Sequence, residues 1–430
     1  MSFGMATLLS VFVLAAALRL PIVASMFASG VAYLFATKQD IGLLADQTLN
    51  STLGMSILVA VPMFILTANI MNAVTISDRL WNAGSALVGR LRGGHGHVTV
   101  LMNIVMSSMT GSAVSDVAGA GVVAIRQMRT QGGYSGGLAC AIAASASLLG
   151  PLIPPSIPMV LYALLSGASI GALFLAGLIP GLMVALSISI WIYVIADRRK
   201  LPFGERVPLR EWPRVLGQAF VPLTLPGVLL GGIWFGIFTP TEAAAVAAFW
   251  AALIGFVWYR NLTPRAFLEV FRESSRQSAI VMMLIVSSFI VNYAITNEGV
   301  ADALARWFAA NNFSALGFMI VVNLLFLVLG TVLDGAVMML VFVPILLPTV
   351  KALGIDLVYF GVVVIVNFML AIISPPYGLI LFVLSALTRV PIREINKEIW
   401  LFLIPLTITM FLLIFFPSIT LFLPQYFGYK

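Results

Sequence analysis

The chain has 430 residues, of which 61% are hydrophobic and 9% are charged, and its formal net charge is +7. This composition excludes a disordered chain and an ordinary soluble domain, because many apolar stretches reach the roughly 17–25 residues that cross a bilayer as a helix. The basic residues fall in short loops, which is typical of cytoplasmic loops and argues against a nucleic-acid partner. Cys140 is the single cysteine, which excludes an intrachain disulfide and a cysteine metal cluster.

The first part of the chain alternates apolar stretches with polar loops. Residues 3–18, 20–37 and 55–76 are predicted to span the membrane, and the first of them lacks the basic start and cleavage site of a signal peptide. Residues 40–53 are more polar, with leucines on a helical spacing, and are predicted to lie as a helix along the interface. Residues 77–94 carry three arginines and are predicted to be cytoplasmic.

Residues 95–125 are 31 mainly apolar and small residues, and basic residues stand at both ends. One span would leave one basic end outside, whereas two full spans need about 40 residues. We therefore expect a re-entrant hairpin over about 95–127 that turns at Thr110-Gly111-Ser112.

The next apolar stretch contains four prolines within residues 150–158. Proline lacks a backbone donor and clashes with the preceding turn, so a continuous helix is excluded. A broken helix is therefore predicted over about 136–166, followed by a span over 170–196. The basic residues that follow indicate a cytoplasmic linker over 197–218.

The second half is predicted to repeat this plan. Its elements are two spans (221–236 and 241–259), an interfacial helix (262–277), a span (278–296), a hairpin (313–350), a broken helix (357–387) and a closing span (400–423).

Landmarks of the same type recur at a nearly constant distance along the chain. Pro21 and Pro240 are 219 residues apart, Asn103 and Asn323 are 220 apart, and Pro154 and Pro375 are 221 apart. Corresponding loops carry opposite charge, because 77–94 is basic and 297–312 is acidic, so the halves are predicted to be inverted. We expect an inverted-topology repeat of residues 1–196 and 219–430. Paired breaks in such repeats are typical of the binding site of a secondary transporter.

Hydroxyl groups, glycines and acids concentrate at the predicted turns. Hard cations such as Na⁺ favour several oxygen ligands, which hydroxyls and unwound carbonyls supply. The candidate Na⁺ ligands are Ser107, Ser108, Thr110, Gly111, Ser112, Gly330, Thr331, Asp334 and Ser374. An alternative for each hydroxyl is that it caps a helix or bonds to the carbonyl four residues earlier.

The helix starts after each break offer backbone amides to a substrate carboxylate. The candidate substrate or cavity residues are Asp116, Pro154, Pro155, Ser156, Asn367, Pro375, Pro376 and Tyr377. Asp116 and Asp334 lie within apolar sequence. Each could take part in ion coupling or cap a helix, and the sequence does not decide between these two roles. Glu242, after Pro240-Thr241, is predicted to cap a helix.

Nothing in the sequence indicates a resident cofactor or a metal site other than for Na⁺. His95 and His97 have no cysteine partner and are placed in an interfacial loop. Nucleotide-binding and hydrolase motifs are absent from the sequence, so neither ATP hydrolysis by this chain nor catalytic residues are expected.

Five motifs carry a resemblance to a known family. They are residues 61–69 (VPMFILTAN), 110–116 (TGSAVSD), 150–158 (GPLIPPSIP), 343–348 (VPILLP) and 374–378 (SPPYG). Through them essentially the whole chain resembles the large membrane subunit of the tripartite ATP-independent periplasmic (TRAP) transporters, and the signature G-P-x-I-P-P-S-x-P is quite specific.

This resemblance implies a bacterial inner-membrane permease that imports a small organic acid with Na⁺ by an elevator mechanism. It also implies a small four-helix membrane subunit and a periplasmic substrate-binding protein as partners. Family substrates include C4-dicarboxylates, other carboxylates and sialic acids. The chain departs from the family at Thr110, where serine is frequent, and at Ser374 and Tyr377, where threonine and valine are frequent.

Two other functions are open from the sequence. A stand-alone ion-coupled carboxylate symporter could share the hairpin plan without a binding protein. An intramembrane enzyme is more remote, because Ser112 has no histidine nearby in the sequence and the acids are scattered.

Overall fold

The computed structural model describes residues 2–53, 56–74, 76–204, 208–331, 333 and 335–429. Within these ranges the regular elements are helices, and no strand is formed beyond one isolated bridge between Arg92 and Phe203. Helices are expected here because a segment in lipid must satisfy its own backbone groups. The predicted all-α class is therefore confirmed.

The first half contains eleven α-helices and three other helical turns, counted over the described residues. They are α1 (Phe3–Ala17), α2 (Ile22–Ala36), α3 (Gly42–Leu53), η1 (Ser56–Val59), α4 (Ala60–Ala73), α5 (Ile76–Val88), α6 (Gly94–Thr110), α7 (Ala113–Asp116), the π-helix η2 (Val117–Gly121), α8 (Val122–Thr130), α9 (Gly136–Ser147), α10 (Ile157–Ser166), α11 (Ile170–Arg198) and η3 (Leu209–Glu211).

The second half follows with longer helices. They are α12 (Trp212–Trp234), α13 (Pro240–Leu253), the π-helix η4 (Ile254–Trp258), α14 (Pro264–Asn297), α15 (Val300–Ala310), α16 (Ala315–Leu329), α17 (Gly335–Ala352), α18 (Leu357–Ile372), α19 (Leu379–Thr388), α20 (Ile392–Phe415) and α21 (Pro417–Tyr426). In the described part of the chain, α11, α13 with η4, α14, α17 and α20 are long and apolar enough to cross a membrane.

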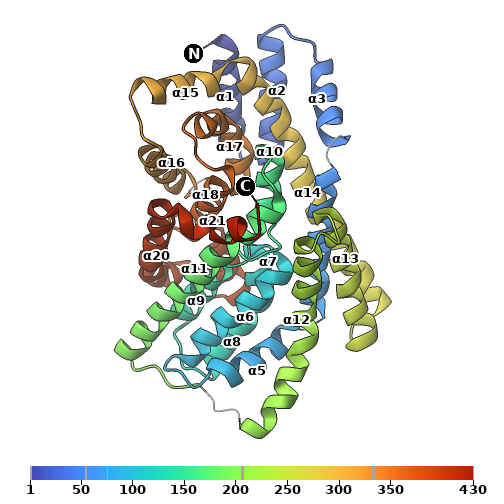
Figure 1. Cartoon of the computed structure of the whole chain (residues 1–430), viewed down its shortest axis with the longest axis vertical. Helices are drawn as coiled ribbons and strands as arrows, with labels where there is room; N and C mark the ends of the chain where they lie inside the picture. Colours follow the sequence, from blue (N-terminus) through green and yellow to red (C-terminus); the bar gives the residue numbers. More distant parts are fainter. Residues whose placement is uncertain are drawn as a thin grey trace.

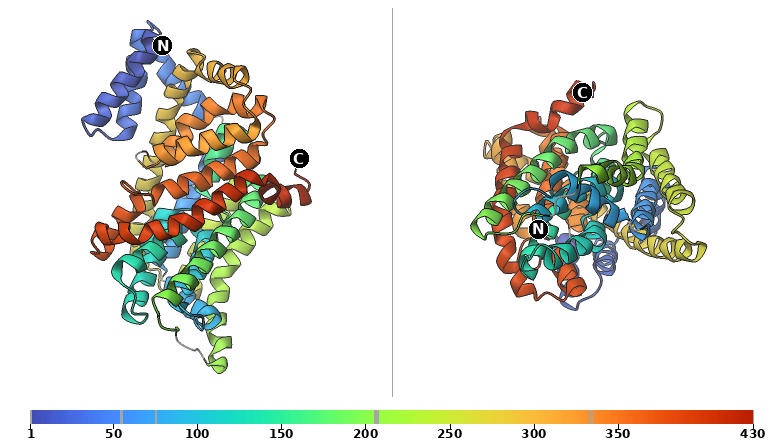
Figure 2. Two further views of the ribbon diagram at one scale, coloured as in Figure 1. Left: turned by 90° about the vertical axis from the view of Figure 1, so that its left-hand side faces the viewer. Right: turned by 90° about the horizontal axis from the view of Figure 1, so that it is seen from below.

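The helices pack as two groups (Figures 1 and 2). Helices α1–α4 and α12–α14 pack on one another and form what we call the scaffold. A separate apolar cluster joins α1, α2 and α14 through Leu8, Met26 and Ile290. Helices α6–α11 and α16–α21 form the second group, which we call the core. Helix α5 packs on α6 and α12, and α15 packs on α17.

Each half of the core contains a helix pair that turns back and a helix that is interrupted. Helix α6 ends at Thr110 and is capped by Gly111, whose φ of +61° is the left-handed conformation that glycine adopts at low cost. Helix α7 begins after Ser112. The α16–α17 pair lies at the other end of the molecule from the α6–α8 pair (Figure 1). The prolines separate α9 from α10 and α18 from α19, and both Pro-Pro bonds are cis.

The interrupted helices pack across the two halves. Helix α10 packs on α17 and α18 of the second half, while α19 packs on α9 and η2 of the first half. The first hairpin and the first break are also joined directly, because the Ile157 N–H donates to the Gly111 carbonyl at 3.3 Å. The breaks therefore lie at the centre of the core.

Several boundaries differ from the sequence-based expectations. Residues 77–94 and 297–312, expected as loops, contain the amphipathic helices α5 and α15. Helix α12 begins at Trp212 within the expected linker, and α14 runs unbroken through the expected interfacial helix and the following span. The loop assignments were wrong because charged residues were taken as loop markers, although they can lie on the solvent side of a helix. The helix expected over 262–277 is found as the first part of α14, and its position at the membrane interface stays a prediction.

The end of the chain differs for the same reason. Helix α20 begins at Ile392, eight residues before the expected span, and includes Arg393 and Lys397. It ends at Phe415, and the separate helix α21 begins at Pro417. Long basic side chains near a helix end can extend toward water, so they do not end the helix.

Packing between α10 and α18 offers a stability test. A Cβ added to Gly361 would lie 2.3 Å from the ring of Tyr162, which is fully buried. We expect Gly361→Ala to destabilise the protein by about 1–3 kcal/mol through overpacking. A lower melting temperature in detergent would show this. The control is Gly227→Ala in α12, where no described atom lies within 4 Å of the new methyl group. Equal melting temperatures of the two variants would contradict the packing.

Candidate functional site

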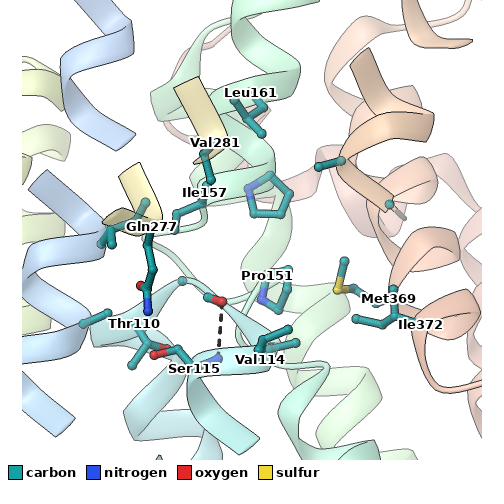
Figure 3. A pocket seen from close by; sticks show the side chains of 18 of the residues that line it. Thr110, Val114, Ser115, Pro151, Ile157, Leu161, Gln277, Val281, Met369 and Ile372 are labelled. Atoms are coloured by element: carbon teal, nitrogen blue, oxygen red, sulfur yellow. Dashed lines mark hydrogen bonds between the residues drawn. The ribbon is translucent and has the colours of Figure 1, made fainter. Parts of the chain in front are cut away.

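A cavity of about 580 Å³ lies between the scaffold and the core (Figure 3). Helices α4 and α14 form one wall, with Asn69, Asn72 and Gln277. The first hairpin, the first break and α18 form the others, and Thr110, Ser115, Pro151, Met369 and Ile372 are labelled in Figure 3. The volume is within the range of pockets that hold small ligands.

Four helical segments begin at this cavity. Their first residues, Ala113, Ile157, Gly335 and Leu379, all line it. The first N–H groups of a helix have no partner within the helix, and its dipole is positive at this end. At α7 and α10 some of these N–H groups already have partners, because the Ser115 N–H donates to Ser112 Oγ and the Ile157 N–H donates to the Gly111 carbonyl. What these helix starts add is therefore mainly the positive end of their dipoles, which favours an anionic group.

A buried carboxylate lies just behind the cavity wall. Asp116 is fully buried and accepts hydrogen bonds from Ser107 Oγ at 3.2 Å and from the Thr110 hydroxyl. Gly150 lies against it, since a Cβ there would be 2.6 Å from Asp116 Oδ2. Ser107, Thr110 and Asp116, which we call the tip cluster, are oxygen ligands of the kind that hard cations favour.

The other hydroxyl candidates bond to backbone. Ser108 and Thr331 donate to carbonyls three residues earlier, and Ser374 donates to the Leu370 carbonyl at 2.7 Å. Ser112 and Ser156 accept from N–H groups three residues later and so cap α7 and α10. These contacts match the capping and back-bonding alternative considered for single hydroxyls.

Of the seventeen candidates, Thr110, Gly111 and Ser112 line the cavity directly. Asn367 is fully buried and donates to the Asn323 carbonyl at 2.7 Å within the core. Tyr377 is 55% exposed and packs against Phe382, outside the lining. The remaining candidates Ser107, Ser108, Asp116, Pro154, Pro155, Ser156, Gly330, Thr331, Ser374, Pro375 and Pro376 are not among the lining residues, and Asp334 lies outside the described residues.

Sequence reasoning missed the scaffold wall. Asn69 donates to Ser274 Oγ at 3.0 Å and to Gln277 Oε1 at 3.1 Å, which joins α4 to α14. Asn72 donates to Ser115 Oγ at 3.0 Å and so joins the scaffold to the core. A carboxamide side chain inside a membrane span is costly unless it has a hydrogen-bond partner. The presence of these carboxamides in apolar sequence could therefore have indicated a polar contact at this wall.

The electrostatics of the site rest on dipoles. Among the described lining residues none carries an ionisable side chain, and the part of the chain that the structure describes holds no cluster of three or more metal-ligating His, Cys, Asp or Glu. Glu242 forms a capping box with Thr239 at the start of α13, as predicted. His95 and His97 lie within α6 rather than in a loop, because Gly93 with a φ of +73° starts the helix ahead of them.

Comparison with known proteins gives a consistent result. Residues 8–419 match the family described as tripartite ATP-independent periplasmic transporter, DctM component. Over 373 residues the chain is 36% identical to the sialic acid TRAP transporter large permease protein SiaM of Vibrio cholerae, covering 86% of this chain and 87% of that protein. It is 34% identical to the C4-dicarboxylate TRAP transporter large permease protein DctM of Pseudomonas aeruginosa, over 86% of this chain and 87% of that protein.

A solved structure and a further relative agree with this. The chain is 32% identical to the 2,3-diketo-L-gulonate TRAP transporter large permease protein YiaN of Escherichia coli, over 94% of this chain and 95% of that protein. Its fold is similar to that of the Alcanivorax borkumensis YdaH transporter, with a TM-score of 0.61 and 16% identity over 96% of this chain and 98% of that one. With its apolar helices and its central cavity, the chain therefore belongs to the DctM family of TRAP transporter components, and it is a multi-pass inner-membrane transporter protein rather than an enzyme.

Proposed function

We propose that this protein imports a small organic acid together with Na⁺, as the large permease of a tripartite system. The observation that carries the proposal is the cavity between scaffold and core, at which four helical segments begin. The substrate would be a carboxylate, as the names of the similar permeases suggest (sialic acid, C4-dicarboxylate and 2,3-diketo-L-gulonate). A periplasmic binding protein and a small four-helix membrane subunit would be its partners.

The substrate carboxylate would bind without a basic side chain. No lysine, arginine or histidine occurs among the described lining residues, so the helix start at Leu379, together with the positive dipole end of α10, would supply the positive potential. A bound Na⁺ would add a full positive charge nearby. This arrangement explains how anion binding could depend on sodium, because each ion lowers the electrostatic cost of burying the other.

Sodium would occupy the tip cluster. Ser107, Thr110 and Asp116 place two hydroxyl oxygens and a carboxylate within one buried group. A buried carboxylate is costly without a counter-charge, and Na⁺ would supply that charge. An equivalent second site would combine Ser374 of the second break with Gly330 of the second hairpin turn, and Asp334, the further candidate there, lies outside the described residues.

The movement would be that of an elevator within an inverted repeat. Support comes from the two groups of helices and from the position of the cavity between them. The core would carry substrate and ion past the scaffold, since the cavity walls formed by α4 and α14 belong to the scaffold, whereas the helix starts belong to the core. Alternating access would follow from sliding one group against the other.

Removing the Thr110 hydroxyl tests the sodium site. We expect Thr110→Val, which keeps the side-chain shape, to raise the sodium concentration for half-maximal uptake by about tenfold or more, because a hydrogen bond or ligand to a charged group is lost. Ser374→Ala should act in the same direction. Sodium activation curves of reconstituted protein measure both.

The control is Thr99→Val, which removes another buried hydroxyl of α6 that donates to the His95 carbonyl. Thr110→Ser should keep the normal sodium response. An unchanged activation curve in both Thr110→Val and Ser374→Ala would rule out the proposed sodium sites.

Reconstitution tests the function as a whole. The chain and its small subunit would be placed in liposomes with an inward sodium gradient, and a panel of organic acids would be offered with and without the binding protein. We expect uptake that requires both sodium and the binding protein. Uptake without the binding protein would instead establish a stand-alone symporter. Uptake that does not need sodium would show that sodium is not the coupling ion.

A further inference from the structure

Helix α17 carries a backbone carbonyl that its own helix cannot satisfy. In an α-helix the carbonyl of residue 340 accepts from the N–H of residue 344, but that residue is Pro344, which has none. Asn292 of α14 takes its place, because its Nδ2 donates to the Leu340 carbonyl at 3.0 Å. A scaffold side chain therefore completes the hydrogen bonding of a core helix.

The first half contains a similar contact. Asn72 of α4 donates through Nδ2 to Ser115 Oγ in the first hairpin at 3.0 Å. The amide lies against Gly119 of η2, where a Cβ would approach Asn72 Oδ1 to 2.4 Å. The glycine leaves just enough room for the scaffold amide to reach the core.

The two asparagines correspond by position and by chemistry. Asn72 and Asn292 are 220 residues apart, which is the spacing of the landmarks that relate the two halves. Both lie on the scaffold helix that borders the hairpin of their own half, and both donate to that hairpin. In both, the buried Oδ1 has no hydrogen-bond partner among the described residues.

We propose that Asn72 and Asn292 are paired positioning residues that hold the core against the scaffold in this conformation. The inference rests on the proposed function, since only a core that moves has to break these bonds. A buried amide oxygen without a partner lowers the stability of the fold. We therefore attribute each asparagine to its contact with the hairpin and not to a gain in folding stability. Release of the two contacts would accompany the movement of the core.

The first test measures the balance between conformations. Ile280, which lines the cavity from α14 and is 55% exposed, would be replaced by cysteine in a Cys140→Ala background. An impermeant thiol reagent would be applied to right-side-out and to inside-out vesicles. We expect Asn292→Ala to shift the ratio of the two labelling rates by about tenfold, because the Leu340 carbonyl loses its partner.

The matched control is Asn297→Ala in the same helix. Asn297 donates to the Tyr33 hydroxyl at 2.7 Å, a contact that stays within the scaffold, so its removal should change the ratio less than twofold. Pro344→Ala alone should shift the ratio in the same direction as Asn292→Ala, because the restored N–H can donate to the Leu340 carbonyl within the helix in either conformation. Measured against Pro344→Ala, the further substitution Asn292→Ala should therefore change the ratio little. An unchanged ratio in Asn292→Ala, or an effect that persists in full beside Pro344→Ala, would overturn the assignment.

The second test separates this inference from the elevator itself. Asn72→Cys with Ser115→Cys would be oxidised to a disulfide that joins scaffold and core, and uptake would be measured before and after reduction. We expect no uptake when cross-linked and recovery on reduction. Uptake that continues while cross-linked would reject the moving core and with it the proposed mechanism. Arrested uptake together with an unchanged labelling ratio in Asn292→Ala would reject only the role of the asparagines.

Discussion

The structure depends on one constraint: backbone groups that proline or a turn releases inside the bilayer must find partners within the protein. At the first break the Ile157 N–H donates to the Gly111 carbonyl, and Ser156 Oγ donates to the Pro151 carbonyl at 2.6 Å. On α17 the carbonyl freed by Pro344 is satisfied from another helix. The first break is thus tied to the first hairpin and α17 to α14, and the hairpins and broken helices border one central cavity.

The described residues that line the cavity carry no charged side chain, so the electrostatics of the site depend on helix dipoles. Helix starts such as those at Ile157 and Gly335 supply partial charges that are fixed in place and need no counter-ion when the cavity is empty. A lysine or arginine in the same position would have to be desolvated and paired in every state. Dipoles can thus attract a carboxylate while the empty cavity remains tolerable in a membrane interior.

Much of this organisation could be predicted from the sequence. The length of an apolar stretch predicts a membrane helix, and prolines within the stretch predict where that helix is interrupted. The turn at Gly111 and the interruptions at residues 150–158 and 374–378 follow from backbone chemistry alone. The amphipathic helices α5 and α15 were missed because their charges resemble loop charges. The scaffold wall was missed because Asn69, Asn72 and Gln277 meet the core only through tertiary packing, which no spacing along the chain reveals.

The contact between Gly150 and Asp116 has a thermodynamic consequence. Gly150 lies against the Asp116 side chain, and the Ile157 N–H donates to the Gly111 carbonyl, so the hairpin tip and the first break are joined at two points. In the proposed mechanism these two segments would travel together, so their oxygen ligands would keep the same geometry on both faces of the membrane. Sodium would then bind with similar affinity on either side of the membrane.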